Sequence, residues 1–198
     1  MEKMASLASP TEVTEFIERE LGIKNIFMVV GQPGSGKSTF MKILMDIGGN
    51  NFCVDTDAYS KPLRPVIEEK FGKTDVIDIA IIRPREMITV IARKWLEMAA
   101  APLVQAPAES NVFVEIPYGL RPEFQMYRYF GAKIIYVGCE DETVSKKRIA
   151  ARGNPQTMRF IKTIPDKLLT LEIAAKNSLK VTCIDTSKTI GDLRLEAA

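Results

Sequence analysis

Histidine is absent from this chain of 198 residues. Its absence excludes a Ser-His-Asp triad, a Cys-His dyad, zinc bound through imidazole and a histidine proton shuttle. Any general base must therefore be a carboxylate, a lysine, a tyrosine or a thiolate. Cysteine is scarce as well. Cys53, Cys139 and Cys183 are far apart in the sequence and form no CxxC pair, so we expect three reduced, buried thiols.

A charge imbalance and long apolar segments are also missing. The 27 basic and 25 acidic residues leave a net charge of +2, which does not indicate an extended nucleic-acid or membrane surface. No apolar run approaches the roughly 18 to 20 residues that span a bilayer, and the N-terminus lacks the pattern of a signal peptide. With 46% hydrophobic residues the chain can bury a core. We expect a soluble cytoplasmic protein without a membrane partner, folded as a single domain over residues 1–198.

Short apolar segments alternate with helical patterns along the chain. Strands are expected at residues 26–30, 52–54, 111–116, 133–138 and 180–184. Helices are expected at residues 9–22, 37–47, 66–71, 87–100, 122–130, 142–151, 165–177 and 190–195. This alternation predicts an α/β protein whose parallel sheet carries helices on both faces.

Residues 31–38 read Gly-Gln-Pro-Gly-Ser-Gly-Lys-Ser and match the pattern G-x-x-x-x-G-K-[ST], between an apolar strand and an amphipathic helix. Glycines let successive backbone N–H groups point at one anion, and the following helix adds the positive end of its dipole. A lysine in this position reaches the β- and γ-phosphates, and the serine hydroxyl after it ligates Mg²⁺. The expected contacts with a nucleoside triphosphate come from Gly31, Pro33, Gly34, Ser35, Gly36, Lys37, Ser38 and Thr39.

Other parts of the sequence indicate which class of phosphate-loop protein this chain resembles. The N-K-x-D sequence with which GTPases read guanine does not occur. The third strand ends in a single carboxylate, Glu115, and motor ATPases usually have a longer chain. The compact length and the sequence Asp55-Thr56-Asp57 favour a small kinase.

On these residues the chain resembles the small phosphate-loop kinases, the group of the nucleoside-monophosphate, shikimate and polynucleotide kinases. The resemblance rests on the loop at 31–38, on Asp55-Thr56-Asp57, on a basic segment at 146–152 and on Ile184-Asp185-Thr186-Ser187. It implies the three-layer P-loop NTPase fold with strand order 2-3-1-4-5, a lid at about residues 141–160, and an acceptor across the carboxyl ends of the strands. It also implies ATP on the loop, with Thr186 and Ser187 beside it.

Three acidic residues lie at or just after the carboxyl ends of expected strands, where the acceptor is expected to bind. We interpret Asp57 as the base that orients the acceptor hydroxyl and takes its proton, and Asp55 as the acid on the metal side. Asp57 lies 20 residues after Lys37, a spacing similar to that of shikimate and polynucleotide kinases. Either aspartate alternatively caps a helix. Glu115 orients the water shell of the metal, contacts the acceptor, or simply ends its strand.

Basic side chains follow the expected fourth strand, and a second set follows the expected second strand. Arg148 and Arg152, with Lys146 and Lys147 nearby, would place positive charge on the migrating phosphoryl group, and the alternative is a solvated helix face. Gly153-Asn154-Pro155 would then act as a hinge. The residues expected to bind the acceptor, besides Glu115, are Arg64, Arg83, Arg85 and Tyr118.

The chain departs from each of the related kinases. The glycine triplet of shikimate kinases after the third strand is replaced by 115–119, Glu-Ile-Pro-Tyr-Gly, and no full adenylate-kinase lid motif occurs. The main expectation is a Mg-ATP-dependent kinase for the hydroxyl of a nucleotide-type acceptor, such as a hydroxymethylated pyrimidine in bacteriophage DNA. The alternatives are a small-metabolite kinase of the shikimate or gluconate type, a regulatory P-loop NTPase without an acceptor, and a toxin-type kinase. The oligomeric state is not predicted.

Overall fold

The computed structural model describes residues 25–55, 63–72, 103, 105–115, 132–151, 167–176 and 179–187. The strands are β1 (Asn25–Val30), β2 (Asn51–Asp55), β3 (Asn111–Glu115), β4 (Lys133–Gly138) and β5 (Val181–Asp185). The helices are α3 (Lys37–Ile47), α5 (Leu63–Phe71), α9 (Glu142–Ala151) and α11 (Lys167–Lys176). The helices expected at 9–22, 87–100, 122–130 and 190–195 lie outside the described residues.

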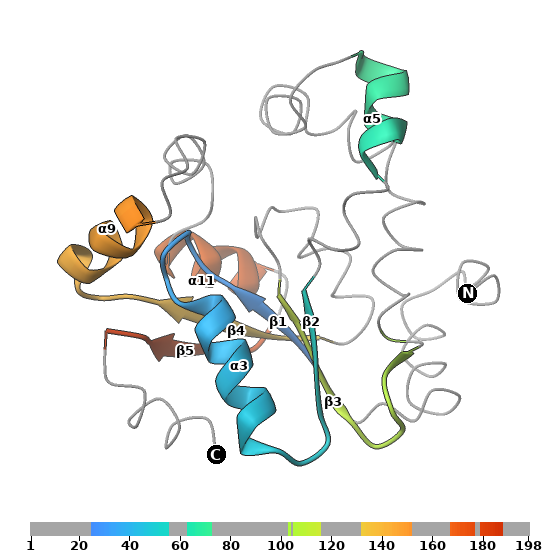
Figure 1. Ribbon diagram of the computed structural model, residues 1–198, viewed down its shortest axis with the longest axis horizontal. Coiled ribbons are helices and arrows are strands. Elements are labelled where there is room, and N and C mark those ends of the chain that lie inside the picture. The colour runs from blue at the N-terminus through green and yellow to red at the C-terminus, as the bar shows by residue number, and fades with distance from the viewer. Residues whose placement is uncertain are drawn as a thin grey trace.

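The five strands form one parallel sheet in the order β2-β3-β1-β4-β5 (Figure 1). The central strand β1 is buried along most of its length, as its uninterrupted apolar sequence predicts for a strand covered on both faces. Because all strands run in the same direction, their carboxyl ends meet along one edge of the sheet. The phosphate loop (residues 31–38) begins at that edge, directly after β1.

Helices cover both faces of this sheet. Figure 1 shows α3 in front of the sheet and α11 behind it, where α11 packs against β4. Helix α3 buries Phe40, Met41, Ile43 and Leu44, with an expected stabilisation of about 1.5–3 kcal/mol for each fully buried side chain. Ile47 continues the same helical spacing, but it is 40% exposed because α3 ends there. None of the described helices is long and apolar enough to cross a membrane.

The three cysteines are free, but they are less buried than expected. Cys53 on β2 and Cys139 after β4 are half-buried, and Cys183 on β5 is exposed, although β2 and β5 are both edge strands of the sheet. The sequence prediction of three buried thiols is therefore wrong for Cys183. Burial raises the pKa of the Cys53 thiol to about 11.

The cysteines are expected to differ in reactivity. Near neutral pH an alkylating reagent should modify Cys183 at least about tenfold faster than Cys53, because the thiolate is the reacting form and Cys53 stays protonated in its half-buried position. Peptide mass spectrometry over a time course measures both rates, and Cys183→Ser serves as the control. Equal rates in the folded protein would contradict this placement of the two strands.

Candidate active site

The phosphate loop connects the end of β1 to the first turn of α3. Within the loop the Ser35 amide donates to the Gln32 carbonyl at 3.0 Å, and the Phe40 amide donates to the Gly36 carbonyl at 2.9 Å, which starts the helix. Gly36 occupies the N-cap position and has no side chain to cap the helix. The first backbone N–H groups of α3 therefore face the loop without a side-chain cap from Gly36, which is the arrangement that binds an anion at a helix N-terminus.

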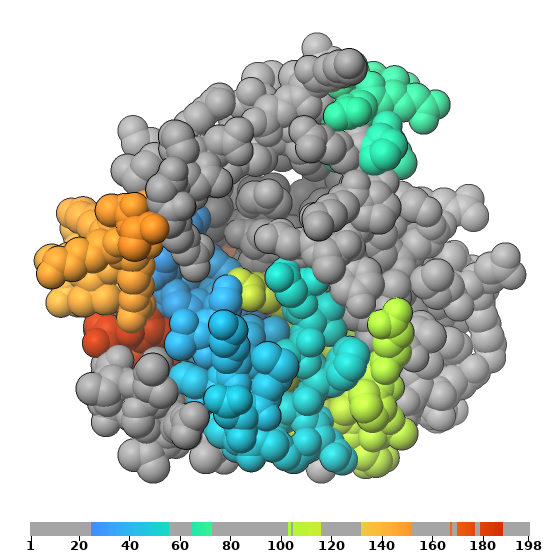
Figure 2. All heavy atoms as spheres, viewed as in Figure 1, coloured from blue at the N-terminus to red at the C-terminus, as the bar shows by residue number. Residues whose placement is uncertain are grey.

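Two glycines of the loop lie directly against other elements. A Cβ atom on Gly31 would lie far inside van der Waals contact with the Val137 carbonyl oxygen of β4. A Cβ atom on Gly34 would lie 2.7 Å from Cγ1 of Ile149 on α9, and Gly34 has a φ of +79°. These approaches explain why the loop requires glycine here. Figure 2 shows α9 beside the start of α3 on one face of the molecule.

Lys37 holds its ammonium group inside the loop. Its side chain is buried, with 8% of the residue exposed, and Nζ donates to the Gly31 carbonyl at 2.8 Å and to the Gln32 carbonyl at 3.4 Å. The positive charge is thus held by the first turn of the loop. This position suits a lysine that meets the phosphates of a bound nucleotide as a point charge.

The strand register brings two carboxylates together at the edge of the sheet. Asn25 Nδ2 donates to Asn111 Oδ1 at 2.9 Å, and Asn51 pairs with the same Asn111 in the register of β2 and β3. The first residues of β2 and β3 are paired in register and each strand has five residues. Their last residues are therefore paired as well, which places Asp55 beside Glu115. The two acids that the sequence separates by sixty positions are neighbours in the fold.

Ser38 connects one of these acids, Glu115, to the phosphate loop. Its hydroxyl donates to Oε1 of Glu115 at 3.2 Å, and both Ser38 and Asp55 are exposed. A hydroxyl and carboxylates at the mouth of a phosphate loop fit Mg²⁺, which takes a few protein oxygens and fills its octahedron with water and phosphate oxygens. Of the three interpretations open for Glu115, the bond to Ser38 favours the metal side. Contact with an acceptor stays a prediction.

The basic segment of α9 divides into two groups. Lys146 and Lys147 are exposed, and Lys146 pairs with Glu142 at 2.8 Å, with side chains 76% and 82% exposed. The hydrogen bond to Glu142 raises the pKa of Lys146. For these two lysines the solvated helix face is the better interpretation. Arg148 is half-buried instead, and its Nη1 lies 3.5 Å from the Gly34 carbonyl of the loop.

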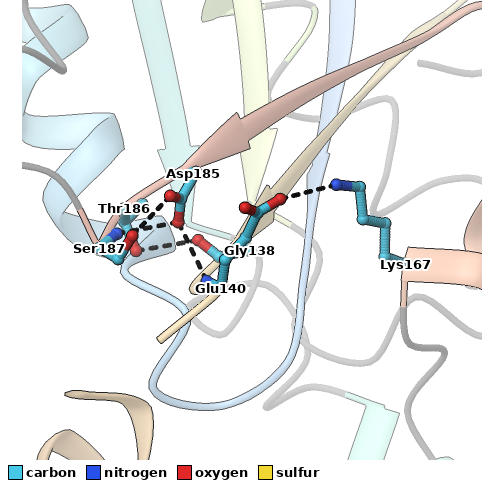
Figure 3. A network of polar contacts seen from close by, with 6 residues as sticks. All are labelled: Gly138, Glu140, Lys167, Asp185, Thr186 and Ser187. Carbon is cyan, nitrogen blue, oxygen red and sulfur yellow. Dashed lines mark hydrogen bonds and ion pairs between the residues drawn. The ribbon is translucent and has the colours of Figure 1, made fainter. Parts of the chain in front are cut away.

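The turn after β5 is tied to the end of β4 (Figure 3). Asp185 Oδ1 accepts from the backbone amides of Glu140 and Ser187, both at 3.0 Å, and the Ser187 hydroxyl donates to the same carboxylate. Glu140 also binds Lys167 of α11 at 2.9 Å, and this hydrogen bond raises the pKa of Lys167. The turn thereby places Thr186 beside the phosphate loop, and the contact of Ser187 with a nucleotide stays a prediction. Sequence reasoning missed this role of Asp185, although an aspartate two residues before a serine is a recognisable turn signal.

The remaining site predictions lie outside the described residues. Arg64 belongs to α5, but its side chain is not part of the described structure. The expected lid is described as far as Ala151, where α9 ends, and the hinge at 153–155 lies beyond it. The roles expected for six residues therefore stay predictions: Asp57, Arg64, Arg83, Arg85, Tyr118 and Arg152.

No protein-family model matches the sequence, and no curated protein matches it. Solved structures do resemble it. A gluconokinase from Sinorhizobium meliloti 1021 has a TM-score of 0.53 at 16% identity, over 87% of this chain and 89% of that chain. The protein TT1252 from Thermus thermophilus has a TM-score of 0.57 at 22% identity, over 87% of this chain and 95% of that chain. Together with the sheet order, these likenesses show that the chain has the three-layer fold of the small P-loop kinases.

Proposed function

We propose that this protein is a Mg-ATP-dependent kinase that transfers the γ-phosphoryl group to a hydroxyl of a small anionic metabolite. The observation that carries the proposal is the bond from Ser38 to Glu115 beside the buried ammonium group of Lys37. It combines a phosphate loop, a metal-binding hydroxyl and a strand-end carboxylate in one place. Phosphoryl transfer needs little more than such positioning and charge.

The proposed chemistry assigns one role to each group. Lys37 and the loop amides would bind the phosphates, with Ser38, Asp55 and Glu115 on the metal side. Bound Mg²⁺ would neutralise charge on the β- and γ-phosphates. Asp57 would accept the proton of the acceptor hydroxyl, whose oxygen attacks the γ-phosphorus while the bond to the bridging oxygen of ADP breaks.

The arginines have separate parts in this proposal. Arg148 and Arg152 would supply positive charge near the phosphates, Arg148 from the side of α9 that contacts the loop and Arg152 from the segment that follows α9. Arg64, Arg83 and Arg85 would hold the acceptor, because a guanidinium group binds a carboxylate or a phosphate with two parallel hydrogen bonds. A hydroxyl acceptor that also carries an acidic group fits these residues.

The choice of acceptor class rests on the fold likeness and on charge. The S. meliloti neighbour is a gluconokinase, which favours a small-metabolite acceptor of the sugar-acid type. Neither neighbour points to a nucleotide or to DNA, and a net charge of +2 does not suit a large DNA footprint. The nucleotide-type acceptor, including a hydroxymethylated pyrimidine in DNA, is therefore the second acceptor class, which the experiment below also tests.

A transfer screen with γ-labelled ATP tests the function. It covers sugar acids, polyols, nucleosides, nucleotides and oligonucleotides with modified bases, and label is expected on a sugar-acid acceptor in the presence of Mg²⁺ only. Asp57→Asn should lower transfer by about 10²-fold or more and leave ATP binding intact, because only the base is lost. Asp46→Asn, an exposed aspartate on α3, is the matched control.

The outcomes separate the classes of function. Label on a modified oligonucleotide alone would establish the nucleotide-type acceptor in place of the small metabolite. Release of free phosphate at a rate that Asp57→Asn leaves unchanged would indicate a regulatory NTPase and overturn the kinase proposal.

A further inference from the structure

Thr186, in the turn after β5, is a polar residue that is almost completely buried behind the phosphate loop. It is 1% exposed. Its hydroxyl oxygen contacts groups from three segments: the Ser35 carbonyl oxygen of the loop, the Gly138 carbonyl oxygen at 3.0 Å and the Arg148 Nη1 at 2.9 Å. A buried hydroxyl with this many partners has a defined orientation.

The single hydroxyl proton of Thr186 can be assigned from these contacts. Arg148 only donates, so the Thr186 oxygen accepts from it. The Gly138 carbonyl already accepts from the Thr186 backbone amide at 2.9 Å. The Gly138 carbonyl is thus satisfied without the hydroxyl, and we assign the hydroxyl proton to the Ser35 carbonyl. The Thr186 hydroxyl thus accepts a hydrogen bond from the guanidinium group of Arg148 on α9 and donates one to the backbone of the loop.

This bond sets the direction of one peptide group in the loop. In a trans peptide the C=O and N–H bonds point in opposite directions, so the Ser35 carbonyl and the Gly36 amide form one rigid unit. With the carbonyl held by Thr186, the Gly36 N–H points away from Thr186. The backbone of Gly36 also rests against this residue, since a Cβ atom there would lie 2.9 Å from the Thr186 hydroxyl.

Arg148 holds Thr186 with both arms of its guanidinium group. Nη1 donates to the hydroxyl and Nη2 to the backbone carbonyl, each at 2.9 Å. A fork of this kind restricts orientation more than a single bond does. Since Ile149 packs on Gly34 one residue further along α9, the helix and the loop are joined at two neighbouring points.

We propose that Thr186 is a positioning residue for nucleotide binding, whose Arg148-held hydroxyl turns the Gly36 amide toward the phosphates. The sequence analysis expected Thr186 to touch the nucleotide, whereas this inference has it act through the loop. It rests on the proposed function only in requiring that the loop binds ATP. Acceptor and transfer have no part in it.

The test measures binding of a non-hydrolysable ATP analogue by titration calorimetry. Thr186→Val keeps the shape and removes the hydroxyl, and is expected to weaken binding about tenfold or more, as for a lost bond to a charged partner. Thr186→Ser keeps the hydroxyl and should bind within about threefold of the native protein. Thr182→Val, at an exposed threonine on β5, the strand before Thr186, is the matched control and should change nothing.

An NMR spectrum of the backbone amides gives a second measurement, which would not change if the role of Thr186 were purely structural. The Gly36 resonance should shift on addition of the analogue in the native protein and in Thr186→Ser, and should shift much less in Thr186→Val. The amides of α11 should be the same in all three variants. If Thr186→Val does not fold, the pair Thr186→Ala and Thr186→Ser isolates the hydroxyl in the same way.

Two results would overturn the inference. One is native affinity in the folded valine or alanine variant, and the other is equal weakening in the serine variant, which would assign the effect to packing by the methyl group. A protein that binds the analogue normally but phosphorylates no acceptor would refute the kinase proposal and leave this inference standing.

Discussion

Lys37→Met is expected to lower kcat/KM for phosphoryl transfer about 10³-fold. The ammonium group lies inside the loop, 2.8 Å from the Gly31 carbonyl, and in the proposed function it is the cation that meets the triphosphate. Methionine retains the length and apolar body of the side chain but carries no charge and no donor. Steady-state kinetics on the acceptor found in the transfer screen measures the loss, and calorimetry with the ATP analogue shows how much of it is binding.

Lys42→Met is the control for Lys37→Met. Lys42 is on the same helix α3 and is exposed, so this substitution should leave kcat/KM unchanged. The unfolding temperature of both variants shows whether the fold is preserved. Near-native transfer by Lys37→Met would mean that the triphosphate is held elsewhere, and the assignment of the phosphate loop would fail.

Gly31→Ala is expected to destabilise the protein by about 3 kcal/mol or more, since the new methyl group would overlap a backbone oxygen. That oxygen is the Val137 carbonyl of β4, a backbone atom held in the sheet beside β5, so it cannot move aside as the end of a flexible side chain could. For a chain of this size such a loss lowers the midpoint of thermal unfolding by about 6–12 °C. Thermal unfolding followed by circular dichroism measures it, and nucleotide binding should fall as well.

Gly49→Ala separates the overlap from backbone strain. Gly49 has a φ of +78°, and a Cβ atom there would meet nothing within 4 Å. Its replacement should cost only the strain of a left-handed alanine, about 1–2 kcal/mol. If Gly31→Ala costs no more than Gly49→Ala, β4 does not lie against the loop in the way described.

Local features of this fold were predictable from the order of residues. The strand at Lys133–Gly138 and the helices at Lys37–Ile47 and Glu142–Ala151 agree with the expected boundaries, and within the described residues the other elements differ by at most three residues at an end. The reason is that strand and helix formation depend on hydrophobic period and on turn residues close in sequence. The phosphate loop was predictable for the same reason, because its geometry depends on glycines within eight consecutive residues.

The surroundings of the loop were not predictable in this way. Thr186 is 151 positions from Ser35, and Arg148 is 38 positions from Thr186, so neither contact has a local pattern. The division of the basic segment also depends on packing. Only the rotation of α9 determines that Arg148 turns toward the loop and Lys146 toward solvent.

By itself the amino-acid order determined the alternating α/β architecture, the anion-binding turn and the residue types able to act there, since these follow from short-range spacing. Only the tertiary structure decided which distant groups meet: Asp55 with Glu115 through strand register, and Ser35 with Thr186 and Arg148 behind the loop. Contacts between strands and between a helix and a loop depend on how separate elements are stacked. That stacking is set by burial of the whole core, which no short segment of the chain encodes.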